Sequence, residues 1–164
     1  MPNINAKVKA SVTAICGGKA ATSAHIKTAD AIFSSVGKVY HIDEDLFPAF
    51  GALGGASGAF VLMYIDALAE AGVRAGFARP IAEEIATATV MGSGALAMNS
   101  SEHPIALMNA VYSPGGTTIE GVCKLRELGL HRRAAGAPGD NRQGLLFGDE
   151  LTRLPVRLLR HPDR

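Results

Sequence analysis

The sequence predicts a mainly α-helical protein in which a short α/β segment precedes four or five helices. The first observation is a strand, helix and strand pattern over residues 12–42, which is the arrangement of an α/β layer. The second is a pair of long stretches without a formal charge, residues 46–65 and 85–101, which favour buried helices. The third is that 48% of the 164 residues are apolar, which allows a hydrophobic core and excludes general disorder.

The α/β segment is predicted from two apolar runs that flank a helical pattern. Residues 12–16 are rich in β-formers and end at a pair of glycines, so we expect a strand there. Thr22 or Ser23 can cap a helix that continues to Gly37. Residues 38–42 repeat the strand pattern. Because no glycine-rich nucleotide loop comes before the first strand, we expect only the trailing end of an α/β layer.

The first uncharged stretch, residues 46–65, has the length of a membrane-spanning helix. Pro48 and four glycines interrupt it, and a helical pattern continues past Asp66 to Glu70. Small side chains let helices pack with their backbones close together, so we expect a helix inside protein. A membrane helix is the alternative.

Three further helices are predicted over residues 79–98, 104–111 and 117–128. The last begins with the capping-box pattern Thr117-x-x-Glu120. The helices are apolar around much of their circumference and must therefore be buried on most sides. Because one chain of this length can hardly supply that cover, we expect a second copy.

Composition excludes several classes of protein. The absence of Trp and an aromatic content of 5% argue against a base-stacking nucleic-acid surface. Two cysteines, Cys16 and Cys123, cannot form a disulfide framework or a multi-cysteine zinc site. The five histidines are scattered, so we expect surface or capping roles and no metal. No secretory signal pattern is recognised, which predicts a cytoplasmic protein.

The net charge of +1 hides a break in the sequence near residue 130. Residues 1–130 carry three Arg, six Lys and eleven acids, whereas residues 131–164 carry seven Arg, no Lys and four acids. Gly and Pro also make this tail a poor helix former. Our hypothesis is that residues 131–164 are read from a shifted frame of a GC-rich gene. A natural, disordered basic tail is the alternative.

The most specific feature is the segment Ser-Pro-Gly-Gly-Thr-Thr at residues 113–118. Its glycines allow a sharp turn and let a ligand reach the backbone N–H groups. Two hydroxyls and the unpaired N–H groups of the following helix can bind a carboxylate or a phosphate. A plain capped turn between two helices explains the same residues, so the pattern alone leaves both interpretations open.

Residues 104–125, PIALMNAVYSPGGTTIEGVCKL, closely resemble the signature of the pyrroline-5-carboxylate reductase family. The resemblance covers roughly residues 1–130 in unbroken order. Its other blocks are Met-Pro-Asn at residues 1–3 and residues 33–39, 43–46, 66–76 and 101–104.

The resemblance implies a helical dimerisation domain of the 6-phosphogluconate-dehydrogenase-like C-terminal type, preceded by a remnant of an NAD(P)-binding Rossmann domain. Residues 1–45 would be the Rossmann remnant, residues 46–130 the dimerisation and substrate-binding domain, and residues 131–164 a divergent tail. The implied activity is reduction of 1-pyrroline-5-carboxylate to L-proline with NADPH or NADH in proline biosynthesis. The implied partners are a second copy or a higher oligomer and the substrate, with no nucleic acid and no membrane.

The resemblance also implies roles for individual residues. Ser113, Gly115, Gly116 and Thr117 would hold the substrate carboxylate. Thr118 would bind substrate too, with its hydroxyl near the ring nitrogen as hydrogen-bond partner or proton relay.

Two more site residues follow from the resemblance. Glu102 would be a second catalytic residue, and Asn3 lies where the family's chain passes the cofactor.

The sequence departs from the family pattern at several places. The glycine-rich nucleotide loop is missing, and Phe60 and Tyr112 replace family residues of different polarity or size. We therefore expect the chain to keep dimerisation and the substrate loop without independent reductase activity. The alternative is a non-catalytic helical module that pairs with full-length reductase.

Overall fold

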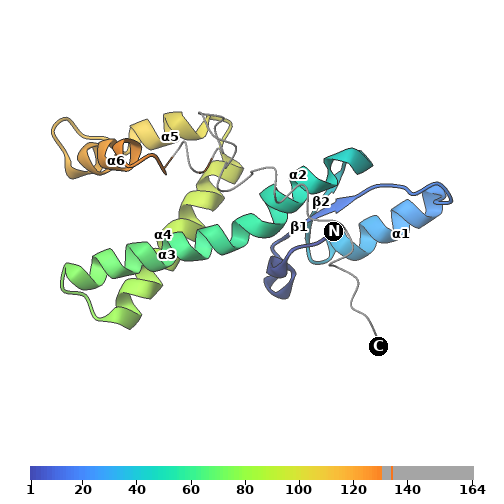
Figure 1. The fold of residues 1–164 in the computed structure, drawn as a ribbon, viewed down its shortest axis with the longest axis horizontal. Helices are drawn as coiled ribbons and strands as arrows, with labels where there is room; N and C mark the ends of the chain where they lie inside the picture. Colours follow the sequence, from blue (N-terminus) through green and yellow to red (C-terminus); the bar gives the residue numbers. More distant parts are fainter. Residues whose placement is uncertain (131–133, 135–164) are drawn as a thin grey trace, which may run out of the picture. The chain divides into compact units, whose positions relative to one another are not determined.

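The computed structural model describes residues 1–130 and Ala134, and apart from that residue the predicted tail 131–164 lies outside the described residues. A short parallel sheet with one helix comes first, and helices follow (Figure 1). The predicted mainly helical fold class with a preceding α/β segment is therefore confirmed. The described chain divides into two compact units, Met1–Gly58 and a second that begins at Ala59. The predicted domain boundary after residue 45 stays a prediction.

The first unit contains the predicted strand, helix and strand as β1 (Ser11–Ile15), α1 (Ser23–Ser34) and β2 (Gly37–His41). The strands are parallel and pair in register along their full length. Thr22 caps α1: its hydroxyl accepts from the His25 N–H at 3.3 Å, and His25 Nδ1 accepts from the Thr22 N–H at 3.3 Å. The predicted cap is thus confirmed, and the helix begins where the sequence places it.

The N-terminal residues lie along the edge of β1 that β2 leaves open. The Met1 ammonium donates to the Ala14 carbonyl at 2.7 Å, and the Ala14 N–H donates to the Met1 carbonyl at 3.1 Å. A 3-10 turn, Ile4–Val8, then leads into β1. Ser11 and Thr13 of β1 are almost fully buried.

One long helical run follows, and it is not a regular α-helix throughout. After a 3-10 turn (Glu44–Leu46) it comprises α2 (Phe47–Phe50), a π-helical turn (Gly51–Ala56) and α3 (Ser57–Arg74). The Ser57 N–H donates to the carbonyl five residues earlier, which is the wide hydrogen-bond pattern of a π-helix. The predicted helix is therefore present, and its π-helical turn contains three of the four glycines in the uncharged stretch.

By length and composition this run qualifies as a possible membrane span. It extends over 31 residues, Glu44–Arg74, and an 18-residue stretch within it has a mean hydropathy of 1.6. A core helix of a non-membrane protein can meet the same two criteria, so the run alone decides nothing about a membrane.

In the second unit α3 packs against α4 (Arg79–Asn99) through small side chains. Ala69, Ala82 and Ala86 are buried between them, and a Cβ on Gly72 would lie 3.1 Å from the Ala82 Cβ. The helices therefore approach closely, and Ile65 and Leu68 of α3 pack against the alanines, whereas many other large apolar side chains are exposed. Exposed examples on the two helices are Leu62, Met63, Ile81, Ile85, Met91, Leu96 and Met98.

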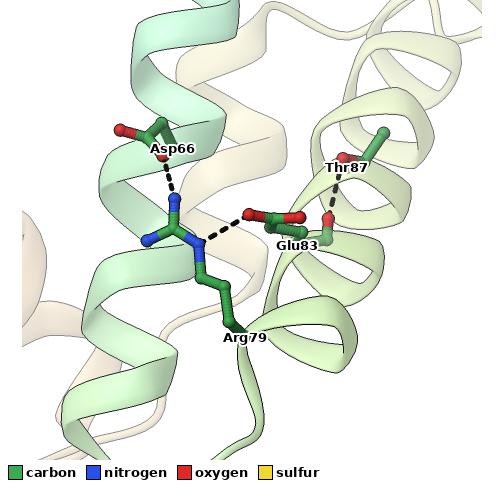
Figure 2. A network of polar contacts seen from close by, with 4 residues as sticks. All are labelled: Asp66, Arg79, Glu83 and Thr87. Carbon is green, nitrogen blue, oxygen red and sulfur yellow. Dashed lines mark hydrogen bonds and ion pairs between the residues drawn. The ribbon is translucent and has the colours of Figure 1, made fainter.

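A polar network ties α3 to the first turn of α4 (Figure 2). The Arg79 guanidinium donates through Nη2 to Asp66 Oδ1 on α3 and through Nε to Glu83 Oε1 on α4, the latter at 2.6 Å. The Thr87 hydroxyl donates to the Glu83 carbonyl at 2.7 Å. The hydrogen bond to Glu83 and the adjacent carboxylates raise the pKa of Arg79, so its charge persists.

Candidate functional site

The predicted substrate loop connects α5 (Pro104–Ala110) to α6 (Thr117–Glu127). The Gly116 N–H donates to the Ser113 carbonyl at 3.0 Å and closes a four-residue turn. Proline occupies the second position of this turn, and Gly115 occupies the third with φ of +67°. This arrangement has the residue pattern of a type II turn. The conformation of the loop therefore follows from the Pro-Gly pair within it.

Each glycine of the loop is required for a different physical reason. Gly115 adopts the left-handed region, which side chains other than glycine rarely occupy. At Gly116 a Cβ would lie 2.2 Å from Ser113 Oγ and 3.1 Å from the Ser113 carbonyl oxygen. A side chain at Gly116 would therefore displace the Ser113 hydroxyl and crowd the Ser113 carbonyl.

The N-terminus of α6 carries no side-chain cap, so the predicted Thr117–Glu120 capping box is wrong. The N-cap residue is Gly116, whose backbone is extended, and Thr117 is already the first residue of the helix. The physical reason is that the turn ends at Gly116, which supplies the extended conformation that an N-cap needs.

Exposed hydrogen-bond donors therefore gather at this end of α6. Ser113, Thr117 and Thr118 are exposed, and no hydrogen bond of their hydroxyls occurs within the part of the chain that the structure describes. First-turn N–H groups lack intrahelical partners, and the helix dipole makes this end positive. The loop can accept a carboxylate or a phosphate by its chemistry.

The structure groups five of the predicted site residues and leaves two outside the group. Ser113, Gly115, Gly116, Thr117 and Thr118 are neighbours on the loop and the first turn of α6.

Glu102 lies in the connection between α4 and α5, with an exposed side chain. Its backbone N–H donates to Ser100 Oγ at 3.0 Å, and within residues 1–130 no hydrogen bond or ion pair joins Glu102 to the loop. Next in the chain, His103 Nδ1 accepts from the Ile105 N–H at 3.2 Å and caps α5. The connection is therefore shaped by local caps.

Asn3, predicted beside a cofactor, belongs to the first unit and is engaged there. Its Nδ2 donates to the Gly54 carbonyl at 2.7 Å, and its Oδ1 accepts from the Asn5 N–H at 3.2 Å. Both ends of the carboxamide thus bind the protein's own backbone.

Tyr112, which precedes the loop, carries an unusual hydroxyl. Its Oη is buried and has no hydrogen-bond partner among the described residues. A buried polar atom without a partner costs free energy, so tyrosine at this position is less favourable for folding than phenylalanine.

The histidines of the described chain serve as caps and surface residues, as expected. His25 and His103 cap helices, and His41 Nε2 lies 3.0 Å from Asp30 Oδ1 on the exposed surface. Within residues 1–130, no group of three or more His, Cys, Asp or Glu side chains is arranged for a metal ion.

Comparison with known proteins gives the family. The protein-family model described as pyrroline-5-carboxylate reductase dimerisation matches residues 44–137, which is more than half of the chain. The chain belongs to the pyrroline-5-carboxylate reductase family.

Relatives extend the match to the first unit. The chain is 43% identical over 130 residues to pyrroline-5-carboxylate reductase of Synechocystis, covering 79% of this chain and 49% of that protein. It is 38% identical over 130 residues to the Escherichia coli reductase, covering 79% of this chain and 48% of that protein. The chain thus spans about half the length of the curated relatives it matches.

Solved structures of the family have the same fold. The Streptococcus pyogenes reductase superposes with a TM-score of 0.78 at 38% identity, covering 82% of this chain and 52% of that one. The Plasmodium falciparum enzyme, solved with NADP bound, gives a TM-score of 0.76 at 28% identity. The match covers 80% of this chain and 54% of that one. The predicted family is therefore confirmed.

Proposed function

We propose that this chain supplies the dimerisation and substrate-carboxylate part of a reductase that converts 1-pyrroline-5-carboxylate to L-proline with NADPH or NADH. The observation that carries the proposal is the glycine turn at Gly115 and Gly116, which leaves the donors at the start of α6 exposed. A helix N-terminus with accessible N–H groups favours a carboxylate ligand. The family's substrate is a cyclic imine that bears one carboxylate.

The loop residues would divide the work of holding this substrate. The backbone at Gly115 and Gly116 and the hydroxyls of Ser113 and Thr117 would bind the carboxylate. Thr118 would place its hydroxyl near the ring nitrogen as hydrogen-bond partner or proton relay. An imine accepts hydride more readily when its nitrogen is protonated, so orientation and proton supply are the contributions expected from the protein.

Glu102 is a proposed catalytic residue on the family resemblance alone, because its side chain lies exposed in a connecting segment. Asn3 is a proposed cofactor neighbour on the same ground.

The described residues do not fit a dinucleotide pyrophosphate, which binds at a helix N-terminus after a glycine-rich strand–helix turn. The first-turn amide of α1 is used by its own Thr22 and His25 cap. The other strand, β2, is followed by the acidic residues 43–45, which would repel a pyrophosphate. NAD(P)H supplies the hydride when bound, and the described residues do not supply the site that holds its pyrophosphate.

Self-association would cover the apolar side chains of α3 and α4. Exposed Leu, Ile and Met side chains on both helices are costly in water, and a second copy buries them by symmetry. We propose a homodimer or a higher oligomer in the cytoplasm, without membrane or nucleic acid.

A second candidate function is a non-catalytic module that pairs with full-length reductase. The specific observation in its favour is the set of exposed apolar side chains on α3 and α4, which a reductase subunit would cover. Both candidates predict dimers, and they differ in whether substrate turnover depends on this chain's loop.

The experiment is an assay of NAD(P)H oxidation with 1-pyrroline-5-carboxylate, with molecular mass measured in parallel. The chain alone is expected to be dimeric and inactive, whereas a mixture with full-length reductase should be active. In that mixture Thr118→Ala in this chain lowers turnover if its loop binds substrate and leaves it unchanged if the chain is a passive module. Robust turnover by the chain alone would contradict the proposal.

A further inference from the structure

The π-helical turn Gly51–Ala56 is the least regular part of the long helical run. π-helical turns are rare and often lie at functional positions. This one ends just before Gly58, the last residue of the first unit, after which the chain enters the second unit within α3. The π-helical turn itself lies wholly within the first unit.

The π-helical turn packs against β1. Gly54 is buried, and a Cβ there would lie 3.0 Å from the Phe50 ring and 3.2 Å from Val12 Cγ2 on β1. Its neighbour Gly55 faces open space, because nothing lies within 4 Å of a Cβ added at that position. Only one of the two adjacent glycines is thus needed for close contact with the strand.

A single side chain from the N-terminus holds the same residue. Asn3 Nδ2 donates to the Gly54 carbonyl at 2.7 Å, across 51 residues of sequence. The other end of the carboxamide is fixed, because Oδ1 accepts from the Asn5 N–H at 3.2 Å and from Ser11 Oγ at 3.3 Å. Ser11 Oγ lies in turn 3.3 Å from the buried Thr13 hydroxyl.

We propose that Asn3 acts as a latch that holds the π-helical turn against β1. Asn3 is then a positioning residue, because its carboxamide acts through the backbone of Gly54. Release of the Asn3 latch, the bond between Asn3 Nδ2 and the Gly54 carbonyl, would loosen residues 51–57 and leave α4 unaffected. The inference goes beyond the proposed function and does not depend on it.

The test is hydrogen–deuterium exchange of the whole chain, read at the backbone amides of residues 51–57. Asn3→Asp keeps the acceptor oxygen but cannot donate to Gly54 when ionised. Asn5→Asp is the matched control, because it adds the same charge two residues away at an exposed position. We expect roughly five- to tenfold faster exchange in Asn3→Asp than in Asn5→Asp, the factor that one hydrogen bond supplies. Asn3→Gln, which keeps a donor, should retain more protection.

A second pair of variants keeps the proposal falsifiable if Asn3→Asp folds poorly. Gly54→Ala inserts a methyl group against Val12 and Phe50, whereas Gly55→Ala inserts one into open space. We expect faster exchange at residues 51–57 only for Gly54→Ala, with equal helix content by circular dichroism. Equal exchange in the two Asn→Asp variants, or acceleration spread equally over α4, would overturn the inference. No substrate or cofactor enters the measurement, so its failure is distinguishable from failure of the proposed function.

Discussion

Substitution of Gly115 by alanine isolates the backbone requirement of the loop. Gly115 has φ of +67°, and nothing lies within 4 Å of an added Cβ, so the only penalty is conformational. An L-residue in the left-handed region costs roughly 1–2 kcal/mol. Gly121, on the exposed face of α6, also has open space around an added Cβ, but it lies in a helix. There alanine should gain about 0.5–1 kcal/mol from helix propensity.

The two Gly→Ala variants are thus expected to change stability in opposite directions. Urea unfolding followed by circular dichroism, at one fixed protein concentration, measures both free energies of unfolding. Gly115→Asn is a third variant, and it should lose less stability than Gly115→Ala, because asparagine tolerates the left-handed region. If alanine at positions 115 and 121 shifted stability in the same direction, the account of the turn would be refuted.

Two further predictions concern single side chains. Tyr112→Phe removes a buried hydroxyl without a partner in the described chain, so the free energy of unfolding should rise by up to about 1–3 kcal/mol in the same urea assay. A decrease would mean that the hydroxyl is satisfied. Arg79→Gln breaks the exposed network that links α3 to α4 and should cause a small loss of stability. About 1 M salt should abolish that loss, and a loss that persists in salt would argue against an electrostatic origin.

Local patterns in the sequence predicted most of the elements because their signals are local. The Thr22 cap of α1 lies where the sequence predicts it, and α4 begins at Arg79, as predicted, with Pro80 in its first turn. Gly129, with φ of +80°, follows the C-terminus of α6 as expected of a helix-ending glycine. Each of these signals acts within a few residues, so no tertiary information is needed to read it.

The sequence-based predictions are wrong or incomplete where a contact between distant residues, or a shift of one residue, determines the local structure. Thr117 and Glu120 have the spacing of a capping box, but the preceding turn moves the N-cap to Gly116. The π-helical turn has no pattern of its own, since it depends on close packing of Gly54 on β1 and on the side chain of Asn3. Such an arrangement depends on groups about fifty residues apart and has no local signature.

The candidate site was predicted in part for the same reason. The Pro-Gly pair indicates the turn, so the grouping of Ser113, Thr117 and Thr118 could be read from the sequence. The family resemblance supplied Glu102 and Asn3. The orphaned hydroxyl of Tyr112 could not be found from sequence, because burial of a single atom depends on packing.

The most direct test of the account is a titration of the isotope-labelled chain with L-proline, followed through its backbone amide resonances. If the start of α6 holds the carboxylate, the amides of Gly116, Thr117 and Thr118 should shift most. Pyrrolidine, which has the same ring without the carboxylate, should leave them in place. Equal shifts with both ligands, or shifts confined to other parts of the chain, would contradict the central claim.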